Sequence, residues 1–333
     1  MKEILVTGGL GYIGSHFCAA IDSSKFSLVI LDNCSNTSKK QLSNIKAINK
    51  NINIDFYETD LLDSVGVDKI FKNHNFDTVI HFAALKSVPE SLLKPEMYYM
   101  NNVIGLTNLL LAMKLSAVNK IIFSSSAAIY GEPNAVPIDE KHSIDPNNPY
   151  SMSKFICEKI IENESINSGL SSIILRYFNP AGFHNSNFLL DYSKNNDKNL
   201  FSSLCHSFSS DEEFIINGSD YETLDGTPVR DFIHIDDLSH AHILALDYLE
   251  QLYHYEIVNL GSSKGYSVNQ VFQEFSNYSK KDIKYKFLKR RKGDIATSIA
   301  SNTKALNILK WSPSKDLKEM VKSSYENHKC LKD

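Results

Sequence analysis

The stretch Gly8-Gly9-Leu10-Gly11-Tyr12-Ile13-Gly14 decides the fold, because it separates an apolar run at residues 4–7 from a segment with helical periodicity. In that segment Ile13, Phe17 and Ile21 recur every four residues, as on one face of a helix. Glycines in a strand-to-helix turn allow a tight bend and let the backbone approach a pyrophosphate, whose charge the helix N-terminus stabilises. Asp32 ends the next apolar run, about 20 residues further on, where a carboxylate accepts a hydrogen bond from a ribose 2′-hydroxyl. Because this carboxylate would repel a 2′-phosphate, the pattern predicts binding of NAD rather than NADP.

Apolar runs alternate with helical segments through the first half of the chain. The alternation predicts an α/β fold, with a Rossmann-type doubly wound parallel sheet and helices on both faces. It fades towards the second half, where residues 185–199 are polar, rich in asparagine and expected to form a loop. We therefore expect an NAD-binding Rossmann domain over residues 1–178, to which a segment around residues 230–260 returns, and a smaller mixed α/β substrate-binding lobe over residues 179–333. The expected strands lie at residues 4–7, 28–31, 52–56, 78–82, 120–124 and 173–175.

Composition and charge exclude several classes of function. The 333 residues carry 35 basic and 39 acidic side chains, a net charge of −4, which argues against electrostatic binding to nucleic acid. No run in the sequence reaches the roughly 20 apolar residues that a membrane-spanning helix needs. The five cysteines form no C-x-x-C pair and the N-terminus lacks the features of a secretory signal, so we expect a cytoplasmic protein with free thiols. We expect no metal site, because His240 and His242 are two residues apart on an expected helix and point to different faces.

A second group of residues carries the expected chemistry. Tyr150 and Lys154 are four residues apart, and this spacing places both side chains on one face of a helix. The lysine ammonium and the positive nicotinamide of the cofactor are both expected to lower the pKa of the phenol, so that a tyrosinate can act as a base. Ser126 ends an expected strand at the sheet edge where open α/β sheets bind ligands, and it can share a hydrogen bond with Tyr150 and a substrate hydroxyl. These three residues are the predicted catalytic group.

Several motifs together resemble those of the extended short-chain dehydrogenases/reductases. They are Gly-Gly-x-Gly-Tyr-Ile-Gly from residue 8, Ser-Ser-Ser-Ala-x-x-Tyr-Gly from residue 124, Pro-Tyr-x-x-Ser-Lys from residue 149 and Leu-Arg-Tyr-Phe-Asn-Pro-x-Gly from residue 175. The stretches at residues 81–88 and 225–238 narrow the resemblance to the sugar-nucleotide epimerase branch, the UDP-glucose 4-epimerases. The similarity extends from about residue 2 to about residue 312.

The resemblance implies an isomerase that interconverts UDP-glucose and UDP-galactose. In that family the tyrosine removes the proton of the sugar 4-hydroxyl while hydride passes from C4 to NAD, and the 4-keto sugar turns over and takes the hydride back on its other face. Tyr150 would be the base, Lys154 its pKa tuner and ribose anchor, and Ser126 the hydrogen-bond partner. Besides these residues, the glycine stretch and Asp32, the implied cofactor-binding positions are Asn33, Asp60, Leu61, Phe82, Ala83, Lys86, Asn101 and Phe178. Besides Ser126 and Tyr150, the implied nucleotide-sugar positions are Asn179, Asn199, Leu200, Arg230, Arg291, Asp294 and Ser298.

Members of the family are commonly dimers, so the resemblance also implies a homodimer. The apolar helical segment at residues 103–115 is the expected contact with a second subunit.

The chain departs from the family pattern at three places. Residues 185–199 lack the acidic, proline-bearing loop common ahead of the Asn-Leu pair, and Asn217 stands where relatives often carry an aromatic residue against the uracil ring. Ser298 stands where relatives restricted to plain hexoses often carry tyrosine, whereas relatives that accept N-acetylated sugars carry a smaller residue. We therefore hypothesise that UDP-N-acetylglucosamine and UDP-N-acetylgalactosamine also interconvert. The alternative is a serine that points elsewhere.

Other activities of the same fold are the alternatives. A sugar-nucleotide 4,6-dehydratase needs an Asp-Glu pair after the strand-end hydroxyl, and a uronate decarboxylase usually keeps the glutamate. Ala127 and Ala128 occupy these positions and disfavour both reactions. Another nucleotide-sugar epimerase, or a dehydrogenase that exchanges its cofactor, would use the same three catalytic residues. An NAD-binding regulatory protein is the non-enzymatic alternative, but such proteins typically lose the tyrosine or the lysine.

Overall fold

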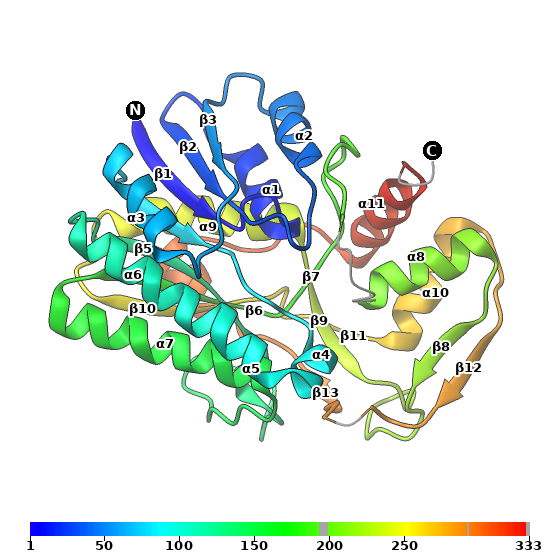
Figure 1. The fold of residues 1–333 in the computed structure, drawn as a ribbon. Coiled ribbons are helices and arrows are strands. Elements are labelled where there is room, and N and C mark those ends of the chain that lie inside the picture. The colour runs from blue at the N-terminus through cyan, green and yellow to red at the C-terminus, as the bar shows by residue number, and fades with distance from the viewer. Residues whose placement is uncertain (193–198, 292, 331–333) are drawn as a thin grey trace.

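A seven-stranded sheet forms the centre of the larger part of the molecule (Figure 1). The computed structural model describes residues 1–192, 199–291 and 293–330. All neighbouring strands of the sheet run parallel, in the order β10-β6-β5-β4-β1-β2-β3, which confirms the predicted Rossmann-type α/β class. The strands are β1 (Lys2–Thr7), β2 (Phe26–Leu31), β3 (Ile54–Tyr57), β4 (Thr78–His81), β5 (Lys120–Ser126), β6 (Ser171–Tyr177) and β10 (Tyr255–Leu260).

Both faces of this sheet are buried, which explains why its strands are continuously apolar rather than alternating. Ile4 and Leu5 are neighbours on β1 and point to opposite faces, yet each is fully buried, in a different core cluster. The helices on the face of Ile4 are α1 (Tyr12–Ala20), α2 (Lys40–Ile48) and α9 (Ile235–Leu249), with the short turn η3 (Ala305–Leu309) beside them. The helices on the face of Leu5 are α3 (Ser64–Asn73), α6 (Gly105–Leu115) and α7 (Pro149–Ser168).

The expected helix at residues 103–115 is part of a longer helical run. A π-helical turn, η1 (Tyr99–Ile104), leads directly into α6, and the short helices α4 (Val88–Leu93) and α5 (Pro95–Tyr98) come before it. Among the described residues, no helix is both long enough and apolar enough to cross a lipid bilayer.

The elements after β6, apart from α9, β10 and η3, form a smaller lobe beside the carboxyl ends of the large sheet (Figure 1). Helices α8 (Leu200–Ser210), α10 (Val268–Ser279) and α11 (Leu317–Cys330) pack together around a cluster rich in phenylalanine. A four-stranded sheet contains β7 (Asn179–Ala181), β9 (Val229–His234), β11 (Gly265–Ser267) and β13 (Thr297–Ser298), and a two-stranded sheet contains β8 (Phe214–Asn217) and β12 (Tyr285–Leu288). Residues 193–198 of the expected loop lie outside the described residues.

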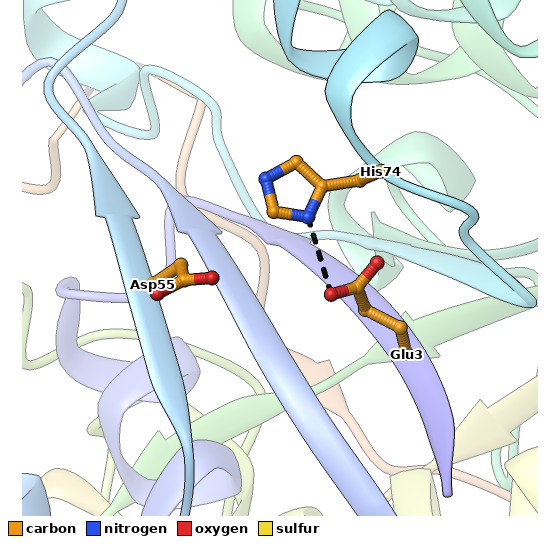
Figure 2. A group of neighbouring side chains, drawn as sticks. All are labelled: Glu3, Asp55 and His74. Carbon is orange, nitrogen blue, oxygen red and sulfur yellow. Dashed lines mark hydrogen bonds and ion pairs between the residues drawn. The ribbon is translucent and has the colours of Figure 1, made fainter.

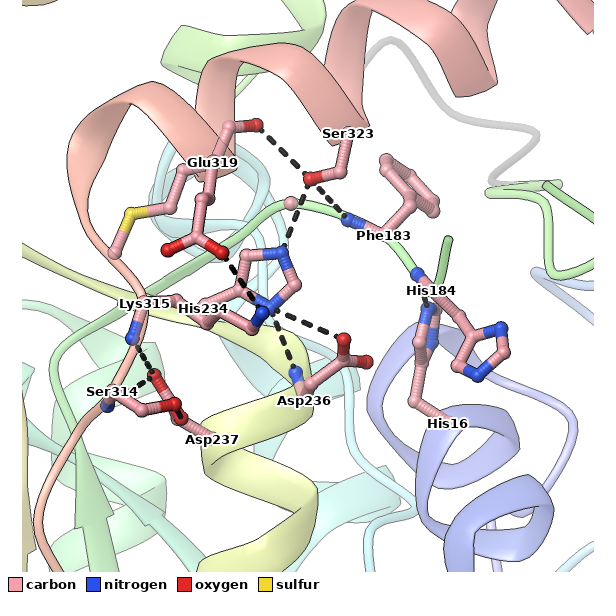
Figure 3. A network of polar contacts seen from close by, with 12 residues as sticks. His16, Phe183, His184, His234, Asp236, Asp237, Ser314, Lys315, Glu319 and Ser323 are labelled. Atoms are coloured by element: carbon pink, nitrogen blue, oxygen red, sulfur yellow. Dashed lines mark hydrogen bonds and ion pairs between the residues drawn. The ribbon is translucent and has the colours of Figure 1, made fainter. Parts of the chain in front are cut away.

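Polar contacts join the two lobes where the chain leaves β7 (Figure 3). On α11, the hydroxyl of Ser323 is 3.1 Å from Nε2 of His234 and accepts a hydrogen bond from the Phe183 amide at 3.1 Å. The next amide, of His184, donates to Nε2 of His16 on α1 at 3.2 Å. The segment after β7 is therefore held between the first and the last helix of the chain. Since α1 also begins at the glycine turn, these contacts fix the small lobe relative to that turn.

Candidate active site

The glycine turn leaves the start of α1 free to bind an anion. Gly11 precedes the helix, no side chain caps it, and its first turn contains no acidic residue. The first amides of the helix therefore remain as donors for a negatively charged group. A Cβ on Gly14 would lie 2.3 Å from the carbonyl oxygen of Gly8, and one on Gly8, whose φ is +70°, would lie 2.6 Å from the amide nitrogen of Ala83. Only glycine at both positions lets the turn pack this closely, which fits the backbone cradle of a dinucleotide pyrophosphate.

Asp32 has a structural role in addition to the predicted one. Its carboxylate accepts hydrogen bonds from the amide of Leu10 at 3.1 Å and from the amide of Cys34 at 2.9 Å. Burial raises the pKa of Asp32, and the two amides lower it, with a net upward shift. The carboxylate thus anchors the glycine turn to the end of β2. Each of its oxygens keeps a second lone pair for a ribose hydroxyl.

One cavity of about 1000 Å³ joins the glycine turn to the small lobe. Its walls come from the carboxyl ends of the parallel strands, from α7 and from the small lobe, as expected for an open α/β sheet. The predicted cofactor-side and catalytic residues that line it are Gly8, Gly11, Tyr12, Ile13, Gly14, Asp32, Asn33, Asp60, Leu61, Phe82, Ala83, Lys86, Asn101, Ser126, Tyr150, Lys154 and Phe178. The predicted sugar-nucleotide residues that line it are Asn179, Asn199, Leu200, Arg230, Arg291 and Asp294.

Helix α7 delivers Tyr150 and Lys154 from its first two turns. Asn148 and Ser151 form a capping box that fixes the start of the helix. The Lys154 ammonium donates to the carbonyl oxygen of Ser124 at 2.6 Å and lies 4.9 Å above the ring of Phe123. Burial lowers the pKa of Lys154 to about 8, although Cys157 and Glu158 raise it. The lysine is therefore held against the end of β5, beside the tyrosine.

Burial raises the pKa of Tyr150, and the hydrogen bond with Ser126 offsets this only in part. The lowering of this pKa by Lys154 and a nicotinamide stays a prediction. The ammonium itself is directed at the carbonyl oxygen of Ser124. Ser126 itself begins the short turn η2 (Ala127–Tyr130) and accepts a hydrogen bond from the Ala128 amide at 3.2 Å. Its hydroxyl proton remains available for the tyrosine or a substrate oxygen.

The small lobe contributes two arginines to the cavity. Arg230 on β9 donates to the carbonyl oxygen of Val229 at 2.9 Å, and burial lowers its pKa. Arg291 lies 3.0 Å (Nη2) and 3.2 Å (Nε) from the side-chain oxygen of Asn217, in the amide orientation that satisfies both groups. Its neighbour Arg290 instead binds Asp220 at the surface. Arg291, which the sequence predicts as a site residue, lines the cavity.

Ser298 is the one predicted site residue that is not part of the cavity lining. It is buried in β13 and pairs with Arg230 of β9 in a parallel register. Directly paired residues of neighbouring strands project from the same face of a sheet. The serine therefore projects from the same face of the sheet as Arg230, which does line the cavity.

The cavity lining also includes residues that the sequence did not predict, among them Tyr177 and Ser124. Tyr177 lines the cavity from the end of β6, and its hydroxyl bonds to the buried His242. Ser124 lies two residues before Ser126 on β5 and also lines the cavity. Its carbonyl oxygen accepts the hydrogen bond from the Lys154 ammonium. Both residues belong to the motifs from residues 175 and 124. Their side chains reach the cavity because each stands at or near the end of its strand, which the motifs alone do not reveal.

Comparison with known proteins identifies the family. A model of the NAD dependent epimerase/dehydratase family matches residues 4–261. The UDP-glucose 4-epimerase of Bacillus subtilis (strain 168) is 40% identical over 324 residues, which are 97% of this chain and 95% of that protein. A crystal structure of UDP-glucose 4-epimerase from Stenotrophomonas maltophila, with bound NAD and formylated UDP-arabinopyranose, is 34% identical, with a TM-score of 0.96 over 100% of this chain and 99% of that one. The UDP-Glc/GlcNAc 4-epimerase of Campylobacter jejuni is 37% identical, with a TM-score of 0.86 over 99% of this chain and 100% of that one. The chain belongs to the NAD dependent epimerase/dehydratase family and, within it, to the UDP-glucose 4-epimerases.

Proposed function

We propose that the chain catalyses the reversible, NAD-dependent epimerisation of a UDP-hexose at C4. The observation that carries this proposal is one continuous cavity. The glycine turn and Asp32 line one part of it, the predicted catalytic group lines the middle, and Arg230 and Arg291 line the other part. A dinucleotide and a sugar nucleotide can therefore meet at Tyr150. When bound, NAD supplies the reversible hydride acceptor that converts C4 of the sugar to a ketone and back.

The residues of the chain bind the substrate and move its proton. Arg230 and Arg291 are placed to make charge-assisted hydrogen bonds with a diphosphate. Tyr150 takes the proton of the 4-hydroxyl and later returns it, and Ser126 holds the same oxygen through a hydrogen bond. The ammonium of Lys154 is fixed on the Ser124 carbonyl, where it can also donate to a ribose hydroxyl. Ala127 and Ala128 offer no group for the acid–base chemistry of a dehydratase.

Turnover without added cofactor tests the proposal. Purified protein is incubated with UDP-galactose, and the anomeric proton signals are followed by NMR. We expect conversion to UDP-glucose, and loss of conversion by a factor of about 10² or more in Tyr150→Phe with NAD still bound. If the wild-type protein has NAD bound but converts no UDP-galactose, the assignment is refuted. That result would favour a dehydrogenase that exchanges its cofactor, or another nucleotide sugar as substrate. Full activity of Tyr150→Phe would remove the tyrosine from the mechanism.

We further propose that N-acetylated UDP-hexoses are accepted. Ser298 points to the Arg230 side of the small sheet, so a larger side chain there would enter the cavity. Ser298→Tyr is expected to lower the rate on UDP-N-acetylgalactosamine relative to UDP-galactose by at least about tenfold, the effect of a steric clash worth ~1.4 kcal/mol. Ser298→Thr is the matched control and should keep the ratio within about twofold. An unchanged ratio in the tyrosine variant would mean that position 298 does not set the substrate range.

A homodimer, formed through η1 and α6, is also part of the proposal. Met100, Ile104, Leu111 and Leu115 repeat at helical spacing along this run and are 52%, 43%, 54% and 72% exposed. An apolar stripe of this kind is typical of a protein interface. Leu111→Glu should convert a dimer into a monomer in light scattering, whereas a monomeric wild-type protein would refute this part.

A cytoplasmic location is proposed from the cysteines alone. Cys18, Cys157, Cys205 and Cys330 are free thiols, and the first three are buried. Secreted proteins usually pair such residues in disulfides.

A further inference from the structure

Three side chains that can each offer one ligand atom to a metal ion lie close together near the amino ends of the strands of the large sheet (Figure 2). They are Glu3, Asp55 and His74. Glu3 of β1 pairs with Ser27 of β2, and Val29 of β2 pairs with Asp55 of β3. Because side chains alternate along a strand, Glu3 and Asp55 project from the same face, the one that α3 covers. His74 follows α3 directly and turns back onto this face. One atom from each of the three side chains lies within 4.8 Å of the other two.

The imidazole of His74 is held in place by neighbours outside the cluster. Its ring stacks on Phe76, with 5.4 Å between centroids and 11° between planes, and its side chain is only 10% exposed. Nε2 lies 2.9 Å from the hydroxyl of Tyr57, which can accept a hydrogen bond from Nε2–H once a metal ion replaces the proton that Nδ1 shares with Glu3. Nδ1 faces Glu3, 3.1 Å from Oε1. Two ligands of a tetrahedral zinc ion with bonds of ~2.0–2.1 Å are about 3.3 Å apart, so this pair is already at ligand spacing.

The two carboxylates lack a cationic partner. Within the part of the chain that the structure describes, the Asp55 carboxylate makes no hydrogen bond or ion pair, and the Glu3 carboxylate contacts only His74. Two negative groups this close repel each other, and a divalent cation between them would remove the repulsion. The exposed Asp55 side chain can move to close the remaining gap.

We propose that Glu3, Asp55 and His74 form a binding site for a divalent transition-metal ion, with Zn²⁺ as its best match. One imidazole nitrogen and two carboxylate oxygens suit zinc better than magnesium or calcium, which prefer all-oxygen sites. Water completes the coordination on the open side. The ion ties β1, β3 and the end of α3 together across β2.

The site is separate from the catalytic cavity. Glu3 precedes Gly8 by five residues of extended chain, about 16 Å along β1. None of the three residues lines the cavity. Binding of the ion therefore stabilises the dinucleotide-binding part without taking part in turnover.

Metal competition on the full-length protein tests the proposal. After treatment with EDTA, the protein is titrated with Zn²⁺ against a chromophoric chelator, and thermal unfolding is recorded with and without the ion. We expect one high-affinity Zn²⁺ per chain, and at least tenfold weaker binding in His74→Gln and in Asp55→Asn. His240→Gln and Asp282→Asn remove exposed groups outside the cluster and serve as matched controls, which should stay within twofold of wild type.

Asp55→Asn keeps the test independent of folding, because the replaced carboxylate is exposed and makes no hydrogen bond or ion pair with any described residue. In wild type and controls Zn²⁺ should raise the midpoint of thermal unfolding, and in the two test variants it should not. Equal Zn²⁺ affinity in test and control variants would overturn the site. Equal competition by Mg²⁺ at the same concentration would overturn the proposed class of metal.

Discussion

The ion pair between Glu158 of α7 and Arg176 of β6 allows a sharp test of what holds the catalytic helix. The guanidinium binds the carboxylate at two points, with Nε–Oε1 and Nη2–Oε2 distances of 3.0 and 2.7 Å. Their side chains are only 0% and 4% exposed. Burial lowers the pKa of Arg176, but its hydrogen bonds with Glu158 outweigh this and raise the pKa overall. The arginine therefore stays charged when Glu158 is neutralised.

Glu158→Gln is expected to lower the free energy of unfolding by about 3–5 kcal/mol, the usual effect of leaving a buried charge without its partner. Glutamine keeps the size of the side chain and one acceptor oxygen for Ser125, so the lost charge dominates the change. In the double variant Glu158→Gln/Arg176→Met the arginine charge is also removed. The Tyr130 hydroxyl keeps its hydrogen bond to Asn259 at 2.7 Å, so the double variant leaves no buried charge and few unsatisfied groups. We expect it to recover at least half of the loss.

Urea unfolding at neutral pH measures these differences. The single tryptophan, Trp311, is buried in the core cluster of the large sheet and reports on its unfolding by fluorescence. A loss below about 1 kcal/mol in Glu158→Gln would refute the reasoning, because that is within the range of ordinary surface substitutions. A double variant as unstable as the sum of the two single variants would refute it too, since coupled charges must show a favourable interaction term.

Three further outcomes follow from the site and its surroundings. Gly14→Ala should lose bound NAD and lower the midpoint of thermal unfolding, because its Cβ would lie 2.3 Å from a backbone oxygen. Gly11→Ala is the control and should keep the midpoint, since its Cβ would lie 3.3 Å from the nearest atom. Equal losses in the two variants would contradict this. Lys154→Met should reduce kcat by about 10² or more with little change in KM for the UDP-sugar, as measured by the NMR assay, and a change confined to KM would assign the lysine to substrate binding only. Acid should destabilise the protein because burial lowers the pKa of His16 and His81 to about 3 and of His242 to about 4. Below their ordinary pKa of 6.5 these histidines take up protons only on unfolding, so each removes about 2 kcal/mol of stability at pH 5. Burial raises the pKa of Asp231 to about 6, so this carboxyl takes up a proton in the folded state and adds back about 1.4 kcal/mol of stability at pH 5. A free energy of unfolding that stays constant from pH 7 to pH 5 would contradict the prediction.

Local patterns in the sequence were sufficient to select residues that meet at the cavity. The glycine turn, Asp32 and the Tyr150–Lys154 pair are each defined by residues close in sequence, and the structure brings all of them to one cavity. Strand order is different, because β10 joins β6 after the chain has passed through the small lobe, and no local signal records this pairing. The position of Ser298 shows the same limit, since its orientation depends on its pairing with Arg230.

The protonation of the tyrosine could not be predicted from the spacing of Tyr150 and Lys154, because it depends on burial. The four-residue spacing places both side chains on one helix face but does not say where the ammonium points. In the structure the nearest strand carbonyl, that of Ser124, binds the ammonium, so burial sets the pKa of the phenol. The spacing along the helix therefore identifies the two partners, whereas the direction of the ammonium depends on the strand packed against the helix.

Tyr150, Lys154 and Glu158 follow one another at intervals of four residues, so the catalytic pair and the buried ion pair occupy the same face of α7. Glu158 binds Ser125, the residue before Ser126, and Lys154 binds the carbonyl of Ser124, the residue before that. Three consecutive residues of β5 thus contact or face this one side of the helix. The helix cannot rotate or slide relative to β5 without breaking the contacts of Glu158, which is fully buried and does not line the cavity. The geometry between Ser126 and Tyr150 is therefore fixed by an ion pair that touches neither substrate nor cofactor. For this reason Glu158→Gln should lower turnover even under conditions in which nearly all of the protein remains folded.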